Sequence, residues 1–388
     1  MSQLGAEKSQ QARALLGENE LWLFLTREGS DPASRLVFDA GVSGMAAFML
    51  HPDRGVLALV ANYDKGHVER LGVFDEIRAY EKSFEDAFNI WLKDLNPTTI
   101  YLNYSESDHL SDGLSHGQFL KIEKISSEVL PQARLSSSES LLAKVRGRKT
   151  KDELRRLKTA IDASSELYEK LLPQLKVGQS EREIQSLMLE IAKDLGFEME
   201  LGDYGGALVC INRVGLAHRA PGDDFVQGGD LVILDHGLYS EGYCSDLART
   251  IYFKKEGEDN APESEKRAFQ SAYDAITKAF EALKPGVEGW QIDKVARDHH
   301  LANGYPEISH ATGHQIGRHI HDGGAVLGPK WERYGKAPYI PLEEGNVFTL
   351  EPTILQSPNP SMLVEENVVI TKEGADWLSK RQTHLWTV

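Results

Sequence analysis

Four acidic residues in the second half of the chain stand in or beside apolar strands, where carboxylates are rare. A buried carboxylate is costly unless it is paired or binds a cation, and four together would repel one another until some held protons. Two divalent ions would balance four negative charges, which makes metal binding the simplest chemistry for this set. The four residues are Asp235, Asp246, Glu351 and Glu365.

The acids occur as two pairs, each on a predicted hairpin. An apolar strand ends at Asp235, turns through Gly237 and Gly242, and returns through Asp246. Antiparallel pairing would set these two carboxylates side by side. A single aspartate there would be interpreted as a turn residue that bonds its own backbone. The second pair, at the end of Asn346–Leu350 and within 363–371, repeats the arrangement and favours metal ligation.

A dense group of histidines lies between the two acidic pairs. Four of them, with glycines between, fall within twelve residues. A site with many oxygen ligands and one imidazole nitrogen favours manganese or cobalt over a structural zinc. His319 is expected at the surface, as are His299 and His300 at the end of a helix. The four clustered histidines are His310, His314, His319 and His321.

The elements that carry these residues fall into two predicted domains, 1–145 and 146–388. The first alternates strands with helices and is predicted to be an α/β domain without an acid–histidine cluster. The second is richer in strands. The expected strands are 21–25, 44–50, 55–61, 99–102, 207–211, 231–234, 247–253, 346–350 and 363–371, and the expected helices include 83–95, 263–283 and 290–303.

The junction between these domains is a charge-rich run from Lys144 to Lys151 that leads into a helix. Thr150 is the predicted N-cap of this helix and Glu153 its capping-box partner. Ser180 is expected to cap a second helix, with Ile184, Leu187, Leu189 and Ile191 facing inward. The basic run is interpreted as a solvated helix start, and no function is assigned to it.

The overall composition excludes several classes of protein. The chain has 388 residues, 41% of them hydrophobic and 26% charged, as in globular domains. A net charge of −16 argues against nucleic-acid and anionic-membrane partners. Only Cys210 and Cys244 occur, so we expect buried free thiols rather than a disulfide framework. With no apparent signal peptide or membrane span, we expect a cytoplasmic protein.

The order of acids, histidines and acids resembles the pita-bread metallopeptidase family, which includes methionine aminopeptidase, aminopeptidase P, prolidase and creatinase. The resemblance covers nearly the whole chain. It implies an α/β creatinase-type N-terminal domain followed by an α+β pita-bread catalytic domain. The length, the spacing of His314 from His321 and the pair Glu351-Pro352 are most similar to prolidase and aminopeptidase P.

The resemblance also implies a role for each site residue. Asp246 and Glu365 would bridge two divalent ions, manganese by preference, with cobalt or zinc as alternatives. Substrate would be bound by His218, His310 and His321. The implied metal ligands are Asp235, Asp246, His314, Glu351 and Glu365, and the implied catalytic residues are Glu351, His218 and His321.

In the implied mechanism, Glu351 takes a proton from attacking water and passes it to the leaving nitrogen. His218 and His321 would stabilise the developing charge on the carbonyl oxygen. One position departs from the pattern, because Leu363 stands where this branch carries an arginine two residues before the last ligand. Arg249, Arg318 or Arg333 would have to substitute for it.

The expected function is hydrolysis of the peptide bond before proline, in Xaa-Pro dipeptides, by a homodimer. The same ligands would serve an Xaa-Pro aminopeptidase acting on longer peptides. The leucine at position 363 keeps open a non-peptidase enzyme of the same fold that breaks C–N or C–S bonds. A non-catalytic peptide-binding module is the weakest alternative, because such a module would be expected to have lost ligands.

Overall fold

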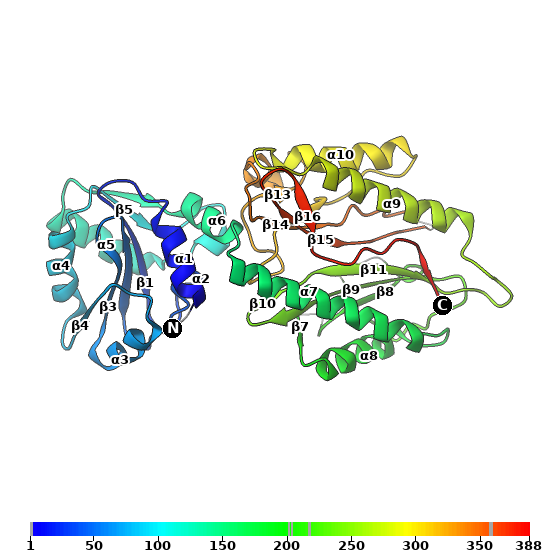
Figure 1. Ribbon diagram of the computed structural model, residues 1–388, viewed down its shortest axis with the longest axis horizontal. Coiled ribbons are helices and arrows are strands. Elements are labelled where there is room, and N and C mark those ends of the chain that lie inside the picture. Colours follow the sequence, from blue (N-terminus) through cyan, green and yellow to red (C-terminus); the bar gives the residue numbers. More distant parts are fainter. Residues whose placement is uncertain (1–2, 201, 203–204, 216–218, 357–359) are drawn as a thin grey trace. The chain divides into compact units, whose positions relative to one another are not determined.

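The computed structural model describes residues 3–200, 202, 205–215, 219–356 and 360–388. Its backbone separates into two compact units, Met1–Arg146 and Gly147–Val388 (Figure 1). The predicted domains at 1–145 and 146–388 remain our proposed organisation. Among the described residues, no helix is both long and apolar enough to cross a membrane.

The first unit is built on one mixed six-stranded sheet in the order β4-β3-β2-β1-β5-β6. The pairs β1–β5, β5–β6 and β3–β4 are parallel, and β1–β2 and β2–β3 are antiparallel. Apolar side chains on the two faces form separate cores, one around Phe38 and Phe48 and the other around Phe88 and Trp91. The strands are β1 Glu20–Thr26, β2 Ala46–His51, β3 Gly55–Ala61, β4 Glu76–Tyr80, β5 Thr99–Leu102 and β6 Arg134–Ser137.

Helices cover both faces of this sheet, as in other α/β domains (Figure 1). The strands expected at 55–61 and 99–102 are confirmed with the same bounds. Strands β4 and β6 were not expected, because both are short edge strands with polar residues. The helices are α1 Gln3–Arg13, α2 Pro32–Phe38, α3 Asn62–Leu71, α4 Phe84–Leu95, α5 His116–Val129, α6 Glu139–Gly147 and the 3-10 turn His109–Ser111.

The second unit has β9, Leu231–Ser240, as its central strand. Strands β8 and β11 pair with its first half, and β7 and β10 with its second half, all antiparallel. A separate antiparallel sheet has the order β14-β15-β16. The other strands are β7 Glu198–Glu200, β8 Leu208–Ile211, β10 Tyr243–Cys244, β11 Leu247–Tyr252, β12 Gly313–His314, β13 Val326–Leu327, β14 Val347–Leu350, β15 Glu366–Ile370, β16 Ala375–Trp377 and β17 Trp386–Thr387.

Two helix pairs border these sheets (Figure 1). Helices α7 and α8 lie along the sheet of β9, and α9 and α10 lie along β14 and β15, with which they share an apolar core. The capping boxes of α7 at Thr150 and of α8 at Ser180 are confirmed. The helices are α7 Lys151–Leu171, α8 Glu181–Asp194, α9 Glu263–Ala282 and α10 Gly289–Ala302, with 3-10 turns Leu172–Gln174, Glu332–Tyr334 and Ala337–Tyr339.

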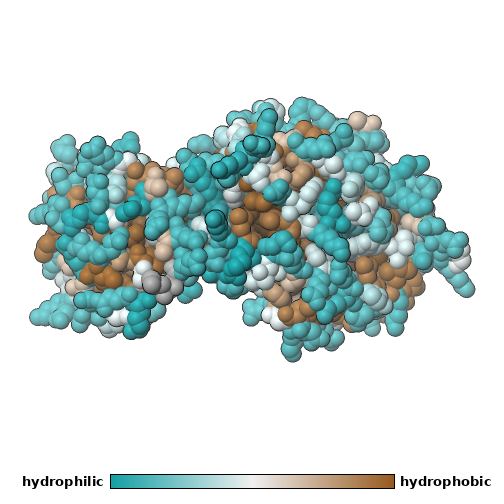
Figure 2. Space-filling view, viewed as in Figure 1, coloured by the Kyte–Doolittle hydropathy of each residue, from teal (hydrophilic) through white to brown (hydrophobic). Residues whose placement is uncertain are grey.

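One side chain of α8 differs from expectation. Leu189 is 38% exposed, whereas Ile184, Met188 and Ile191 are buried. These three follow the spacing of one helical face, and Leu189 falls beside it. On the face shown in Figure 2, hydrophilic residues predominate and apolar residues gather in separate patches, in keeping with the high net charge.

Candidate metal centre

The first acidic pair is placed by the antiparallel register of β9 and β11. Asp235 on β9 is paired with Ala248. Asp246 lies two residues before Ala248, directly ahead of β11, and therefore on the same face in a diagonal position. The hairpin expected from the sequence thus brings the two carboxylates together, but β9 does not end at Asp235: it continues to Ser240, and the chain turns at Glu241 and Gly242.

The second pair flanks the antiparallel strands β14 and β15. Glu351 follows β14 directly, and its N–H donates to Thr312 O at 2.8 Å. Glu365 was expected inside a strand that began at residue 363, but it lies just before β15. Its N–H donates to Ala248 O at 3.0 Å, so the segment before β15 pairs with β11 instead of β14.

A buried asparagine ties the two sheets together between the paired acids. The Asn367 side chain donates through Nδ2 to Asp246 O at 2.7 Å and accepts at Oδ1 from Asp246 N at 3.5 Å. Asn367 stands two residues after Glu365 and is fully buried. Strands β11 and β15 belong to different sheets, and this side-chain amide bonds the backbone at the point where the two sheets meet. It thereby fixes Asp246 relative to Glu365.

The histidine predicted as a ligand meets the acids from β12. His314 Nε2 lies 3.4 Å from Asp246 Oδ2 and 3.5 Å from Glu351 Oε1. One potential ligand atom from each of Asp246, His314 and Glu365 lies within 4.8 Å of the others. Within the described part of the chain, these three residues form a group able to hold a metal ion.

The protonation of the acids reflects burial and mutual repulsion. Burial raises the pKa of Asp235 to about 7. Burial, with Asp235 and Glu351 nearby, raises the pKa of Asp246 well above its ordinary value. Burial and the neighbouring carboxylates likewise raise the pKa values of Glu351 and Glu365. The direction is that expected for clustered acids without a compensating cation.

The histidine is held in the form that binds metals. Its Nδ1 faces Gln315 O at 3.3 Å, so a proton on Nδ1 would be donated there and leave the Nε2 lone pair toward the acids. The backbone N–H of His314 donates to Thr349 Oγ1 at 3.1 Å. Burial lowers the pKa of His314 to about 3, with His321 contributing. A neutral imidazole among four carboxylates suits a divalent cation.

The surroundings of Asp235 also fit a cation. Its Oδ1 is buried and has no hydrogen-bond partner among the described residues. Leu363, at the position of the expected arginine, packs with Cys210, Ile233 and Ala248 in a small apolar cluster. A buried carboxylate oxygen without a hydrogen bond is costly unless a cation ligates it. The donor set therefore fits the group that the sequence predicted.

The three arginines considered as substitutes lie in different places. Arg249 is 2% exposed and donates to Glu365 O and to the carboxylate of Glu366. The Arg318 guanidinium stacks over the Tyr243 ring at 5.1 Å. Arg333 donates to Ser309 O at 2.6 Å. Of the three, Arg249 is bonded directly to a predicted ligand, although to its backbone.

The predicted substrate histidines are partly placed. His218 lies outside the described residues. The His321 and His314 rings are 4.4 Å apart between centroids. His310 is half-buried, and hydrogen bonds hold the backbone on both sides of it.

Helix α10 supplies much of that support. Arg297 donates to His310 O at 2.9 Å and pairs with Asp293 one turn earlier. Asp293 Oδ1 in turn accepts from Thr312 N at 3.1 Å and Oγ1 at 2.9 Å. Sequence reasoning missed this pair, although its four-residue spacing on a helix was a usable signal.

His299 and His300, which were both expected at the surface, differ in burial. His300 is fully buried and bridges Ser271 Oγ and Pro352 O, at 3.0 and 3.2 Å. His299 remains half-exposed. The expectation for His300 was wrong because it faces α9 and the segment after Glu351 rather than solvent. Both cysteines are buried free thiols, as expected.

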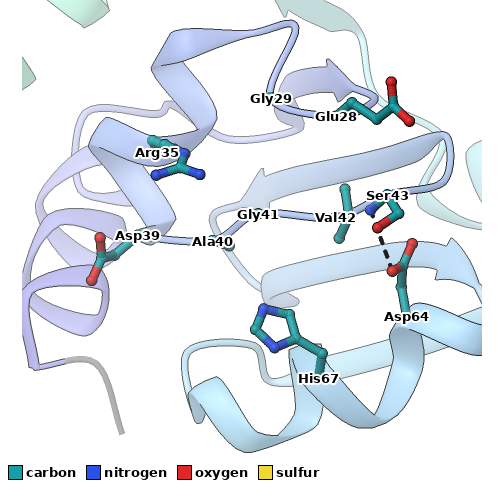
Figure 3. A pocket seen from close by; sticks show the side chains of 10 residues that line it. All are labelled: Glu28, Gly29, Arg35, Asp39, Ala40, Gly41, Val42, Ser43, Asp64 and His67. Carbon is teal, nitrogen blue, oxygen red and sulfur yellow. Dashed lines mark hydrogen bonds between the residues drawn. The ribbon is translucent and has the colours of Figure 1, made fainter.

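A large hollow lies elsewhere, in the first unit (Figure 3). It measures about 660 Å³ and is lined by residues of loops and of α2 and α3. Arg35 and His67 point into it, and the Asp64 carboxylate accepts from Ser43 N at 3.3 Å. None of the predicted ligands lines this hollow. The hollow therefore gives no support to the predicted metal chemistry, whose candidate ligands lie in the second unit.

Comparison with known proteins agrees with the geometry. Residues 155–372 match the sequence profile of metallopeptidase family M24. An Xaa-Pro dipeptidase of Pyrococcus furiosus is 27% identical over 307 residues, covering 78% of this chain and 79% of that protein. An uncharacterized peptidase of Bacillus subtilis is 29% identical over 254 residues, covering 64% of this chain and 66% of that protein, just under two thirds.

Solved structures show the same fold. An X-Pro aminopeptidase from Thermotoga maritima superimposes with a TM-score of 0.75 at 24% identity, covering 97% of this chain and 100% of that one. The prolidase from Pyrococcus horikoshii gives 0.69 at 21% identity, covering 97% and 99%. At these identities the likeness concerns the fold, and it confirms the expected pita-bread architecture.

Proposed function

The chain belongs to metallopeptidase family M24, and we propose that it removes the residue before proline from Xaa-Pro dipeptides with two divalent metal ions. The observation that carries the proposal is the convergence of four buried or partly buried carboxylates around the neutral His314. The similarity to an Xaa-Pro dipeptidase over 78% of the chain supports the substrate class.

Five residues would hold the two ions. A carboxylate set of this charge with one imidazole favours manganese, with cobalt or zinc as alternatives. Bound ions would lower the pKa of water and polarise the scissile carbonyl. The proposed ligands are Asp235, Asp246, His314, Glu351 and Glu365.

The chemistry of the chain's own groups follows from their positions. We assign Glu351 as the base that takes a proton from the attacking water and returns it to the leaving nitrogen. Its 19% exposed side chain is more open to a bound substrate than that of Asp246, at 7%. His321, beside His314, and His218 would donate to the carbonyl oxygen as negative charge develops there. His310 would line the pocket for the proline ring.

The substrate experiment separates the remaining alternatives. The purified chain loaded with Mn²⁺ is assayed on Ala-Pro, Gly-Pro and the tripeptide Ala-Pro-Ala. Cleavage of the dipeptides alone supports the dipeptidase, and faster cleavage of the tripeptide assigns an Xaa-Pro aminopeptidase instead. Metal binding without cleavage of any peptide would favour a C–N or C–S bond enzyme, for which Leu363 leaves room, whereas a chain that binds no divalent metal would favour the peptide-binding module.

The Glu351→Gln variant tests the assignment of the base. Glutamine keeps an oxygen but cannot take a proton, so turnover should fall by at least about a hundredfold while most metal remains bound. Metal per chain is measured by atomic absorption beside kcat. Glu344→Gln, at an exposed glutamate of the preceding turn, is the control and should leave both unchanged. Retained turnover in Glu351→Gln would remove this residue from the role.

We further propose a homodimer, which the resemblance implies for this branch of the family. Analytical ultracentrifugation of the full chain measures the mass in solution. A species of twice the chain mass of 43.2 kDa supports the dimer, and a stable monomer that cleaves Xaa-Pro dipeptides contradicts it.

A further inference from the structure

The basic run at the domain junction contains one lysine that is not solvated. The Lys149 side chain is fully buried, and its Nζ lies 2.9 Å from Asp322 Oδ2, a carboxylate that is 2% exposed. The backbone N–H of Lys149 donates to Gly345 O at 2.9 Å, and this bond fixes the backbone at the start of the second unit. A buried ammonium group is rare unless it is paired, so Lys149 differs from the solvated residues expected in this run.

Asp322 closes the loop that carries two of the site histidines. Its N–H donates to Gln315 O at 2.9 Å, so residues 315–322 return on themselves between His314 and His321. The rings of these histidines consequently lie 4.4 Å apart. The carboxylate of Asp322 is therefore one residue from a proposed substrate donor, at the point where the loop closes.

The ion pair packs closely against the inside of the loop at Gly317. A Cβ at Gly317 would stand 2.0 Å from Asp322 Oδ2 and 3.0 Å from Lys149 Nζ. The outer side of the loop is bonded as well, because Cys244 N donates to Gly317 O at 2.9 Å. A closely packed loop with a buried ion pair at its closure has a defined position relative to the first acidic pair, on β9 and directly ahead of β11.

We propose that Lys149 is a positioning residue, whose ion pair with Asp322 holds the loop 313–322 so that His314 and His321 face the metal centre. The inference rests on the proposed metal site and deepens it. A side chain of this kind acts through the groups it orients, and loss of such support commonly weakens metal affinity or activity by about 10- to 100-fold.

The alternative is that the pair serves stability alone. Lys149→Met would then act only by removing one of the interactions that compensate the buried Asp322 carboxylate. Lys149→Met/Asp322→Asn removes both charges, so a purely structural effect should be largely reversed in it, whereas a positioning effect should remain. Arg148→Met is the matched control, since Arg148 pairs with Glu343 at the same junction and that pair is partly exposed.

The experiment titrates Mn²⁺ into the metal-free full chain by calorimetry and measures thermal unfolding of the same samples. We expect at least about tenfold weaker Mn²⁺ binding in Lys149→Met and in the double variant, with the unfolding midpoint recovered in the double variant and Arg148→Met unchanged. Wild-type affinity in Lys149→Met, or recovery of affinity together with the midpoint in the double variant, overturns the proposal.

These outcomes are separate from those of the proposed function. If the parent chain binds Mn²⁺ but cleaves no Xaa-Pro peptide, the proposed activity fails while the affinities still decide the role of Lys149. If the parent binds no Mn²⁺, both are overturned. Where cleavage occurs, kcat at saturating Mn²⁺ should be lower in both Lys149 variants, because His321 is displaced as well.

Discussion

At the scale of single residues, burial changes what the ionisable groups of the second unit can do. The four acids have raised pKa values, and His314 has a lowered one, for the same reason: each charged form has lost its water. The acids gain from a cation, whereas His314 is kept neutral and able to ligate it. The same burial therefore favours cation binding by the acids and by His314.

His300 gives the clearest pH prediction, although its Nε2 bonds the backbone of Pro352, next to the proposed ligand Glu351. Burial lowers its pKa to about 4, and His299 and Arg297 contribute in the same direction. The unfolded chain binds the proton more tightly, so this contribution to stability is complete above about pH 6.5 and declines as the pH falls to about 4. The total is on the order of 3 kcal/mol.

The His300→Gln variant should therefore be less stable than the parent at pH 7, by a difference that shrinks as the pH falls toward 4. Urea unfolding of both proteins at several pH values measures that difference. His384→Gln, at an exposed histidine, controls for loss of an imidazole as such. A difference that stays constant with pH would mean that His300 does not titrate in this way.

At the scale of elements, the metal centre depends on close contacts between short strands. A Cβ at Gly313, on β12, would stand 2.0 Å from Thr349 O on β14. Only glycine allows β12 to approach β14 closely enough for His314 to reach Asp246 and Glu351. This requirement belongs to the packing of two strands and not to the chemistry of the residue that follows.

Gly313→Ala should consequently displace β12. We expect a loss of about 1–3 kcal/mol in the free energy of unfolding and weaker Mn²⁺ binding. Chemical unfolding and calorimetric titration measure the two effects. Gly117→Ala, on α5 where a Cβ would have no neighbour within 4 Å, should cause neither. Unchanged Mn²⁺ affinity in Gly313→Ala would show that β12 can shift without moving His314 from the acids.

At the scale of the whole molecule, the proposed ligands all belong to one of the two compact units. Bound metal should stabilise that unit, because an ion that binds only the folded form adds stability in proportion to the logarithm of its concentration over Kd, about 2.7 kcal/mol at one hundred times Kd. The first unit contains none of these ligands. Bound metal should therefore stabilise the second unit and leave the stability of the first unit unchanged.

Differential scanning calorimetry with increasing Mn²⁺ tests this inequality. We expect a transition of the second unit that moves to higher temperature and a transition of the first unit that stays in place. EDTA should reverse the shift. A single transition that moves as a whole would show instead that the units unfold cooperatively, and the absence of any shift would contradict metal binding to the folded chain.

The sequence by itself determined much of the local structure, and it predicted a metal-dependent chemistry that remains a proposal. The apolar strand that ends before Glu351 and the caps at Thr150 and Ser180 depend on a few neighbouring residues, and the structure contains each of them, whereas β9 continues past Asp235 to Ser240 instead of ending there. The resemblance then supplied the fold, which the comparisons confirm. The roles of the site residues remain proposals.

The tertiary structure decided what depends on residues distant in the chain. Whether His300 or Lys149 is buried cannot be read from its neighbours, because the burying groups, near 271 and 352 for one and at 322 for the other, come from other elements. The Asn367 side chain donates a hydrogen bond to Asp246, which lies 121 positions away in the sequence. Local pattern specifies which groups can react, whereas long-range packing sets their distances, their protonation and the side chains that hold them.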